Sequence, residues 1–347
     1  MNNPFTITFG KKPKQYIERI MQTKEIIDTF TDEEPSNQVY MLTGVRGCGK
    51  TVMMTSISNT LSAEKDWYCI DLNPDRDLLN SLAAKLYALP NMKKLAFKAK
   101  LDLSAFGFGV SIEEGYLITD VEDAIARMLE QLRKSKKKVL ITIDEVIANE
   151  YVKVFAKSFQ SFIRADYPIF LIMTGLYENI YELQNDKGLT FLYRAPKVVL
   201  SALNFTAVSD SYKKVLKISD DKARELASIC KGYSYAFQIL GYISYEEKNK
   251  SIEDLLPRFD QILAEYVYSK MWSELSGKDK KIIAAIAKEN ISKIKDIRKA
   301  CGGMSPNEFS VYRERLTKKG LLDGSTYGEL NFTLPRFDHF VNSQYEV

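Results

Sequence analysis

The chain has 347 residues, of which 45% are hydrophobic, and a net charge of +4 from 49 Lys and Arg against 45 Asp and Glu. This length suits two or three domains, and no apolar run reaches the roughly 18–20 residues that span a bilayer. The sequence starts without the apolar stretch of a signal peptide, so we expect a cytoplasmic protein. A single histidine, His339, and four cysteines without a C-x-x-C pair argue against zinc chemistry and histidine-dependent hydrolysis.

Residues 39–51, VYMLTGVRGCGKT, predict a strand, a glycine loop and the start of a helix. They follow a leader and an apolar helical pattern over residues 15–30. The spacing G-x-x-x-x-G-K-T is that of the P-loop, whose backbone N–H groups surround a phosphate. We expect Lys50 to bridge the β- and γ-phosphates and the Thr51 hydroxyl to hold Mg²⁺. The sequence thus predicts that ATP and Mg²⁺ bind at Gly44, Val45, Arg46, Gly47, Cys48, Gly49, Lys50, Thr51 and Val52.

A second motif is the apolar run of residues 139–143, VLITI, which is followed by Asp144 and Glu145. Such a run fits a central parallel strand whose carboxyl end faces a ligand. Asp144 would then take the Mg²⁺-linked position of a Walker B motif. Glu145 would act as the general base that polarises the attacking water.

Three further apolar runs, over residues 67–71, 167–175 and 191–200, predict the other strands of a parallel sheet with the strand order 5-1-4-3-2. Thr174 lies at the end of the fourth strand. Either its hydroxyl senses the γ-phosphate, or Thr174 is simply a polar residue at a strand end and has no functional role. Arg194 lies just ahead of the fifth strand. It either stabilises charge on a transferring phosphate, in its own subunit or a neighbour's, or forms a surface ion pair.

Helices are expected at residues 50–63, 77–89 and 149–165, and a capping box over residues 119–122 predicts a helix that extends to residue 134. Residues 96–114 instead alternate between apolar and polar positions, which predicts a β-hairpin that turns near residues 104–107. This hairpin either packs one apolar face on the protein or forms a ribbon that binds a partner.

After residue 205 the strands stop, and the pattern predicts a helical lid with helices at 207–216, 219–230, 234–246 and 251–272. The last segment predicts helices at 280–288, 292–301 and 305–319 and a two-stranded wing over 321–334. This is the arrangement of a winged helix-turn-helix.

The third of these helices is expected to begin at the N-cap Ser305, with Pro306 and Glu308 in its first turn. Its polar side chains suit contacts with double-stranded DNA, and the candidates are Asn307, Ser310, Arg313, Arg315 and Lys318. Residues 277–347 hold 13 Lys and Arg against 9 Asp and Glu, a mild excess that favours a polyanion. Winged helices also serve as dimer or peptide modules, so a protein partner is the alternative.

Together these motifs resemble the AAA+-type ATPases, and among them the bacterial and archaeal ATP-binding proteins related to origin-recognition and STAND ATPases. The similar stretches are Pro4-Phe5, Phe9-Gly10, Pro13 and Arg19 of the leader, TGVRGCGKTV, FLYRA, GYSYAFQILG, and YRERL through to FTLP. The resemblance implies ATP binding, with the leader and Arg19 beside the adenine. Tyr235 stands where many AAA+ proteins have a sensor arginine, which implies slow or partner-dependent hydrolysis.

We therefore expect an α/β fold, with a five-stranded parallel P-loop sheet of AAA+ type, a helical lid and a C-terminal winged helix-turn-helix domain. The expected boundaries are residues 1–205 for the core, 206–272 for the lid and 273–347 for the winged helix. The expected function is ATP binding and hydrolysis, with the nucleotide state controlling a DNA-binding winged helix. The alternative is a STAND-like regulatory switch with low turnover, whose winged helix binds a protein partner or a second copy of the chain.

Overall fold

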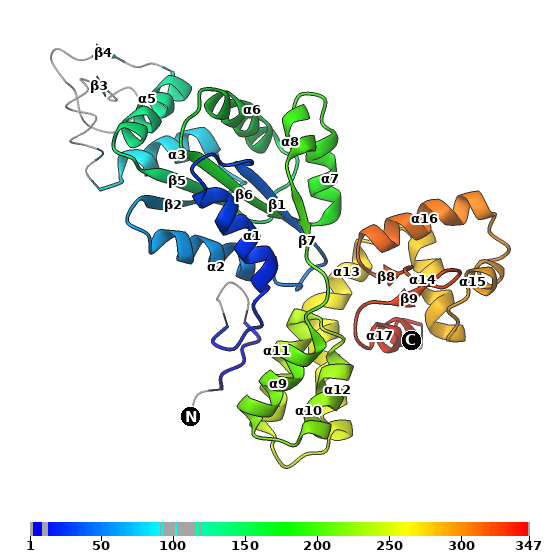
Figure 1. Cartoon of the computed structure of the whole chain (residues 1–347). Coiled ribbons are helices and arrows are strands. Elements are labelled where there is room, and N and C mark those ends of the chain that lie inside the picture. Colours follow the sequence, from blue (N-terminus) through cyan, green and yellow to red (C-terminus); the bar gives the residue numbers. More distant parts are fainter. Residues whose placement is uncertain are drawn as a thin grey trace. The chain divides into compact units, whose positions relative to one another are not determined.

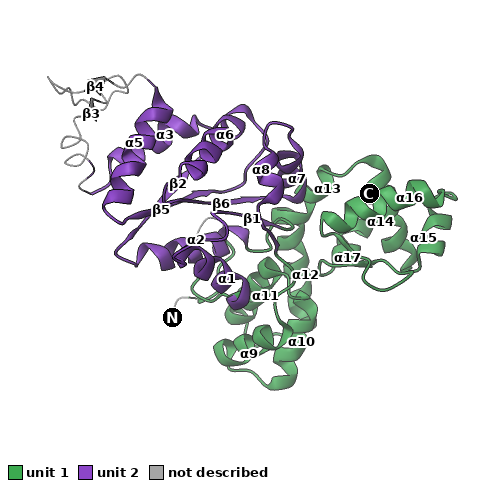
Figure 2. Cartoon of the chain, turned by 45° about the horizontal axis from the view of Figure 1, so that its top comes forward, with its two compact units in different colours: residues 1–19, 44–49, 200–347 green, residues 20–43, 50–199 purple. Residues whose placement is uncertain are grey.

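The computed structural model describes residues 3–8, 13–90, 92, 101–102, 116–117 and 120–345. The chain divides into two compact units, coloured green and purple in Figure 2. Unit 1 comprises residues 1–19, 44–49 and 200–347, and unit 2 comprises residues 20–43 and 50–199. The glycine loop (Gly44–Gly49) therefore belongs to unit 1, whereas the strand before it and the helix after it belong to unit 2. None of the helices in the described part of the chain combines the length and the hydropathy of a membrane-spanning segment.

Unit 2 is built on a five-stranded parallel sheet (Figure 1). The strands are β1 (Val39–Thr43), β2 (Trp67–Leu72), β5 (Lys138–Ile143), β6 (Ile169–Gly175) and β7 (Lys197–Val199). Their order, β2-β5-β6-β1-β7, confirms the predicted order read from the other edge. Because all neighbours pair in parallel, the residues that follow β5 and β6 meet at the same edge of the sheet.

Helices cover both faces of this sheet, which explains why β1 and β6 are buried along their whole length (Figure 1). On one face, α3 (Leu78–Tyr87), α5 (Val121–Lys134) and α6 (Glu150–Arg164) share a core with strand residues such as Met41. The other face carries α1 (Ile20–Thr31) and α2 (Lys50–Ser62). There the ring of Phe30 lies 4.9 Å from that of Phe170 and 5.5 Å from that of Tyr40. Side chains that alternate along each strand therefore serve two cores.

Several ends of elements differ from the sequence-based prediction. The first helix begins at Ile20 rather than at residue 15. The N-cap of α5 is Asp120, whose carboxylate accepts the N–H groups of Glu122 and Asp123, so the predicted capping box does not open this helix. Residues 190–194 form the short helix α8 (Thr190–Arg194) instead of the start of the last strand. Pro196 disfavours helical backbone in the residue before it, which explains why α8 ends at Arg194 and β7 begins only afterwards.

Two other features of unit 2 bear on the predictions. Helix α7 (Tyr177–Asn185) follows β6 and was not predicted. Of the expected hairpin over residues 96–114, the structure describes only β3 (Leu101–Asp102), which pairs in parallel with β4 (Tyr116–Leu117). The rest of that predicted hairpin lies outside the described residues, as do Phe9 and Gly10 of the leader.

In unit 1 the predicted lid is formed by α9 (Phe205–Leu216), α10 (Asp220–Cys230), α11 (Ser234–Glu246) and α12 (Ile252–Leu263). A π-helical turn, η2 (Ala264–Tyr268), and α13 (Ser269–Ser273) continue from α12. The leader packs into this lid, because Phe5 is only 2% exposed and its ring lies 5.5 Å from that of Phe237. A Cβ atom on Gly241 of α11 would lie 2.5 Å from the Phe5 ring, so the glycine makes room for it.

The C-terminal domain (residues 276–345) has the predicted succession of three helices and a two-stranded antiparallel ribbon. These are α14 (Gly277–Glu289), α15 (Ile294–Ala300), α16 (Pro306–Lys318), β8 (Leu322–Asp323) and β9 (Asn331–Phe332). Ser305 caps α16, as predicted. An additional helix, α17 (Phe337–Ser343), packs the ring of Phe337 5.0 Å from that of Tyr268 in η2. The buried side chains of the lid and of the C-terminal domain belong to one hydrophobic core. The division of the chain into a core, a lid and a winged-helix domain stays a prediction.

Candidate functional site

The glycine loop makes a tight turn. The Cys48 N–H donates to the Val45 carbonyl at 3.3 Å, and Gly47 and Gly49 have φ angles of 77° and 98°. Residues with a Cβ atom rarely adopt such angles, so both glycines are required by the backbone. Gly47 has a second requirement, since a Cβ atom there would lie 2.3 Å from the Tyr233 hydroxyl oxygen. The glycines of the motif therefore allow the loop backbone to turn sharply, and Gly47 also allows it to pack closely against Tyr233.

The carbonyl groups of the glycine loop are held by donors from the start of α11 and from the leader. The Tyr233 hydroxyl donates to the Arg46 carbonyl at 2.6 Å, and the Tyr235 N–H donates to the Gly47 carbonyl at 3.1 Å. The Cys48 carbonyl accepts from the Ser234 hydroxyl at 2.8 Å and from the Arg19 guanidinium at 3.1 Å. Three successive carbonyls of the loop therefore contact three successive residues of the lid.

The family resemblance predicts that Arg19, in the leader, lies beside the adenine of ATP. In the structure it is half-buried, and its guanidinium donates to the glycine loop itself. Burial lowers the pKa of this guanidinium, although an arginine keeps its charge throughout the physiological range. A direct role at the adenine stays a prediction.

The side chains at the other end of the motif belong to unit 2, where α2 begins at Lys50. The first N–H groups of a helix have no partner within it, and the helix dipole makes this end attractive to anions. Lys50 itself is only 9% exposed, which is unusual for a lysine unless it is paired or binds a ligand. The start of α2 therefore offers a charged group and oriented N–H groups to a phosphate.

Asp144 links α2 to the carboxyl ends of β5 and β6. Its carboxylate accepts a hydrogen bond from the Thr51 hydroxyl at 2.8 Å and another from the Thr174 hydroxyl. Thr174 is fully buried, and its oxygen also accepts the Glu145 N–H at 3.1 Å. The structure thus brings Thr51, Asp144, Glu145 and Thr174 together. In it, Thr174 orients the Asp144 carboxylate, and the predicted role as a γ-phosphate sensor stays a prediction.

Glu145 is exposed and has a φ angle of 53°, in the left-handed region. This conformation costs about 1–2 kcal/mol for a residue with a Cβ atom. The bond from its N–H to Thr174 and the bond from the Val146 N–H to the Thr174 carbonyl, 2.8 Å, hold the backbone there. Lys217, Lys231 and Asn290 adopt the same region at the ends of helices, so the predicted catalytic role of Glu145 stays a prediction.

The Thr51 hydroxyl and the Asp144 carboxylate fit Mg²⁺. Both supply oxygen ligands, and they already lie within hydrogen-bonding distance of each other. Mg²⁺ is usually held by one or two carboxylates together with substrate phosphates and water, rather than by a cage of protein side chains. This pair meets that requirement beside the start of α2.

Arg194 is the last residue of α8 and is exposed in unit 2. Ala195 and Pro196 separate it from β7, so Arg194 lies just ahead of the fifth strand, as predicted. The prediction that it stabilises a transferring phosphate, in its own subunit or in another, remains open to test.

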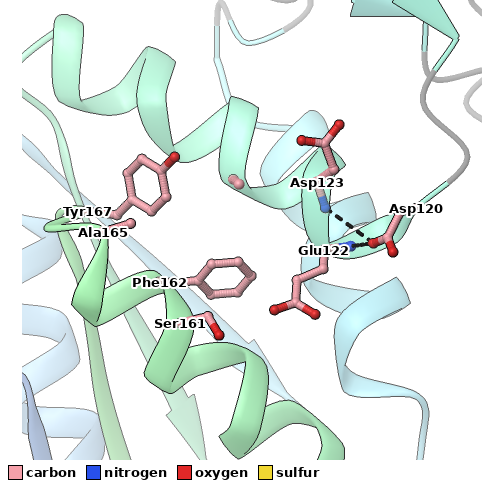
Figure 3. Close-up of a pocket in the computed structure, with 8 residues that line it drawn as sticks. Asp120, Glu122, Asp123, Ser161, Phe162, Ala165 and Tyr167 are labelled. Carbon is pink, nitrogen blue, oxygen red and sulfur yellow. Dashed lines mark hydrogen bonds between the residues drawn. The ribbon is translucent and has the colours of Figure 1, made fainter.

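A separate pocket of about 440 Å³ lies between the start of α5 and the end of α6 (Figure 3). Its lining includes Asp120, Glu122, Asp123, Ser161, Phe162 and Tyr167. Helix α6 has 15 residues, so its C-terminal end lies about 20 Å along the helix from the end near Asp144. The three carboxylates would also repel a polyphosphate, so this pocket is not a second nucleotide site.

The C-terminal domain exposes four of the five side chains predicted to contact DNA, and three of them, Asn307, Ser310 and Arg313 on α16, form no ion pair among the described residues. Lys318 is exposed as well and pairs with Glu314 on the same helix. Arg315 is different, because it binds the carboxylate of Asp279 at 2.5 Å and the Ser276 hydroxyl at 3.0 Å. Asp279 is 2% exposed, so this is a structural ion pair between α14 and α16. Arg315 therefore has a structural role in this domain, and its contact with DNA stays a prediction.

Replacing Arg315 with Ala is expected to destabilise the C-terminal domain by about 2 kcal/mol, because the Asp279 carboxylate would stay buried without its cation. Urea unfolding followed by tryptophan fluorescence would measure this, since Trp272 packs on Phe340 of α17. Arg313→Ala is the matched control, and its exposed position predicts a change within about 0.5 kcal/mol. Equal stability of the two variants would contradict the structural role of Arg315.

Sequence reasoning missed Tyr233, Ser234 and Gly320, which all contact the glycine loop. A Cβ atom on Gly320, at the end of α16, would lie 2.6 Å from Val45 Cγ1. In the sequence, the stretch GYSYAFQILG carries only a family resemblance, and Gly320 directly follows the helix predicted at residues 305–319. The Tyr233 contact spans 187 positions of the chain, so no local pattern could have indicated it.

Comparison with known families places matches on both halves of the chain. Residues 18–174 match a family described as an ATPase domain predominantly from Archaea. Residues 265–341 match a family described as a domain of unknown function. No curated protein matches the chain.

Solved structures match over nearly the whole chain. The Walker-type ATPase Paby2304 of Pyrococcus abyssi aligns with a TM-score of 0.67 and 13% identity, over 97% of this chain and 99% of that chain. The ORC2 protein of Aeropyrum pernix, solved as ADPNP–ADP complexes, aligns with a TM-score of 0.60 and 12% identity over 98% of each chain. Its ADP form gives a TM-score of 0.52, also at 12% identity and over 98% of each chain. At these identities the likeness shows the fold, and it confirms the predicted α/β class.

Proposed function

We propose, from the premise that residues 18–174 carry an ATPase domain of the family that they match, that the protein binds Mg-ATP at residues 44–52 and hydrolyses it. The proposal assigns Thr51 and Asp144 to Mg²⁺, Lys50 to the phosphates, and Glu145 to the attacking water. It further assigns a winged-helix role to the C-terminal domain, whose position on double-stranded DNA would follow the nucleotide state.

The observation that carries this proposal is the contact between the glycine loop and the C-terminal part of unit 1. Arg46 forms an ion pair of 3.4 Å with Glu274, which directly follows α13. Val45 packs so closely against Gly320, at the end of α16, that no Cβ atom would fit there. The loop that would enclose the phosphates therefore also touches the turn that ends the helix that would read DNA.

This contact gives the nucleotide a route to the C-terminal domain. A ligand shifts a conformational equilibrium only by as much as it favours one state over the other. A phosphate that changes the shape of the loop at Val45 and Arg46 changes the surface on which Gly320 rests, so the two sites are coupled. By linkage, DNA that moves α16 would alter nucleotide affinity by the same factor.

The DNA part of the proposal predicts that Arg313→Ala weakens binding to a fluorescent duplex by about fivefold or more. If Arg313 contacts a phosphate, the slope of log affinity against log salt should also fall by about one unit. Anisotropy titrations with Mg-ADP and with a non-hydrolysable Mg-ATP analogue would test both effects. Arg224→Ala, which removes an exposed cation from α10 of the lid, is the matched control and should bind as the wild type does.

The second candidate, a switch with little turnover, is favoured by the bonds that tie the C-terminal domain to the lid. The Arg336 guanidinium donates to the Asp260 carboxylate of α12, with one of its two bonds at 2.6 Å, and the Tyr268 hydroxyl donates to the Pro335 carbonyl at 2.6 Å. Such bonds suit a state that is held closed until a partner arrives. A phosphate-release assay with and without duplex DNA separates the two candidates. Absence of DNA binding even at low salt would leave only the switch with a protein partner.

A further inference from the structure

We propose that Tyr233 and Ser234 of the lid are positioning residues for the nucleotide phosphates, because they hold the peptide units of the glycine loop in the orientation that phosphate binding requires. This inference rests on the proposed function, since it concerns the same loop. It adds a role for lid residues that bind the carbonyl groups of the loop and need not contact the nucleotide.

The direction of the contacts is the first step. In a planar trans peptide, the carbonyl of one residue and the N–H of the next point in opposite directions. The Arg46 carbonyl faces the Tyr233 hydroxyl at 2.6 Å, and the Cys48 carbonyl faces the Ser234 hydroxyl at 2.8 Å. The N–H groups of Gly47 and Gly49 therefore point away from the lid. Backbone N–H groups are the part of a glycine loop that surrounds a phosphate, so the lid donors turn these two toward it.

The middle peptide unit is fixed in the same manner. The Gly47 carbonyl accepts the Tyr235 N–H at 3.1 Å, while the Cys48 N–H closes the turn on Val45. The Tyr235 hydroxyl donates to the Ile7 carbonyl of the leader at 3.1 Å, which anchors the start of α11. The loop thus meets a row of donors whose own positions are set by the lid and the leader.

The chemistry of the two tyrosines suits donation. Burial raises the pKa of the Tyr233 hydroxyl well above its usual value and raises that of Tyr235 to about 12. Both hydroxyls therefore stay protonated across the physiological range. The Arg46 and Cys48 carbonyls accept the hydroxyls of Tyr233 and Ser234, and each such bond polarises its peptide unit. This strengthens the N–H groups of Gly47 and Gly49, on the opposite side of these units, as donors to phosphate.

Tyr233→Phe tests this role, because it removes one hydroxyl and keeps the ring. The Arg46 carbonyl would lose its donor, so we expect the dissociation constant for Mg-ATP to rise by about 5- to 50-fold. Tyr212→Phe is the matched control, since the buried Tyr212 hydroxyl donates to the Phe237 carbonyl at 2.9 Å within the lid. It should lose similar stability and keep the affinity of the wild type, as measured by calorimetric titration.

The serine gives an independent comparison. Ser234→Ala removes the hydroxyl that contacts the Cys48 carbonyl, whereas Ser234→Thr keeps it. We expect a loss of a fewfold for Ala, because Arg19 also donates to this carbonyl, and recovery of affinity for Thr. Equal affinities of the Ala and Thr variants and the wild type would overturn the role of Ser234.

A measurement without nucleotide keeps the inference separate from the proposed function. Cys48 is 3% exposed within the loop, so its rate of alkylation, read by peptide mass spectrometry, reports how firmly the loop is held. Faster alkylation in Tyr233→Phe, but not in Tyr212→Phe, supports the role of Tyr233 in holding the glycine loop. If the wild type takes up no ATP, that result refutes the proposed function but leaves this alkylation comparison valid. Unchanged alkylation in Tyr233→Phe, equal effects in both variants, or faster alkylation with unchanged ATP affinity would overturn the inference.

Discussion

Replacing Lys50 with Ala is expected to abolish measurable uptake and hydrolysis of Mg-ATP, with affinity reduced at least about 100-fold. The reason is that a nearly buried ammonium group at the start of α2 supplies a full positive charge where the phosphates would lie. Hydrogen bonds between charged partners are roughly twice as strong as neutral ones, and a site with little water screens them poorly. Alanine keeps the helix and removes the ammonium group together with the aliphatic chain that carries it.

Calorimetric titration and phosphate release would measure the two effects of Lys50→Ala. Lys65→Ala is the matched control, because Lys65 is an exposed lysine in the turn after α2. It should bind and hydrolyse as the wild type does. Normal hydrolysis by the Lys50 variant would remove the basis of the proposed function.

Glu145→Gln is expected to keep Mg-ATP binding and to lower turnover by about 100- to 10,000-fold, the range that general-base catalysis contributes. Glutamine has almost the same shape as glutamate, so it can occupy the same backbone position, but it cannot accept a proton from water. Single-turnover phosphate release, with binding measured separately, would distinguish lost chemistry from lost affinity. Glu150→Gln, an exposed carboxylate in the first turn of α6, serves as the control.

The left-handed backbone of Glu145 allows a sharper test of the same assignment. Glu145→Gly removes the carboxylate and also the Cβ atom that opposes a φ angle of 53°. We expect it to lose turnover like Glu145→Gln while gaining about 1 kcal/mol of stability from relief of the strain. Wild-type turnover in both variants would show that another group activates the water.

The sheet could be predicted because each of its signals is local. Each central strand is a short apolar run, and two of the strands are marked by what comes directly after them, the glycine loop after β1 and Asp144 after β5. In addition, Ser305 and Asn149 fix helix starts through side-chain bonds within three positions. Such features depend on neighbours in the sequence and not on the rest of the fold.

The features that the sequence did not predict depend on distant partners or on competing local signals. Arg315 lies on α16 among residues suited to DNA, but Asp279 of α14, 36 positions earlier, accepts its guanidinium. The sequence of residues 190–194 is compatible with a helix and with a strand, because a short apolar run does not distinguish the two. The structure forms the helix α8 there, where the sequence predicted the start of the last strand. The contacts of Tyr233 and Gly320 with the glycine loop follow only from the folded unit.

The burial of Phe5 in the lid has a practical consequence for the choice of a fragment to produce. The family match begins at residue 18, so a shortened protein that starts there would contain the whole recognised ATPase segment. It would nevertheless lack the Phe5 ring, which fills the space beside Gly241, and the Ile7 carbonyl, which accepts a hydrogen bond from the Tyr235 hydroxyl and orients it. The amino-terminal stretch is thus an internal part of the helical unit, and a truncation guided by sequence similarity alone would cut through a folded body.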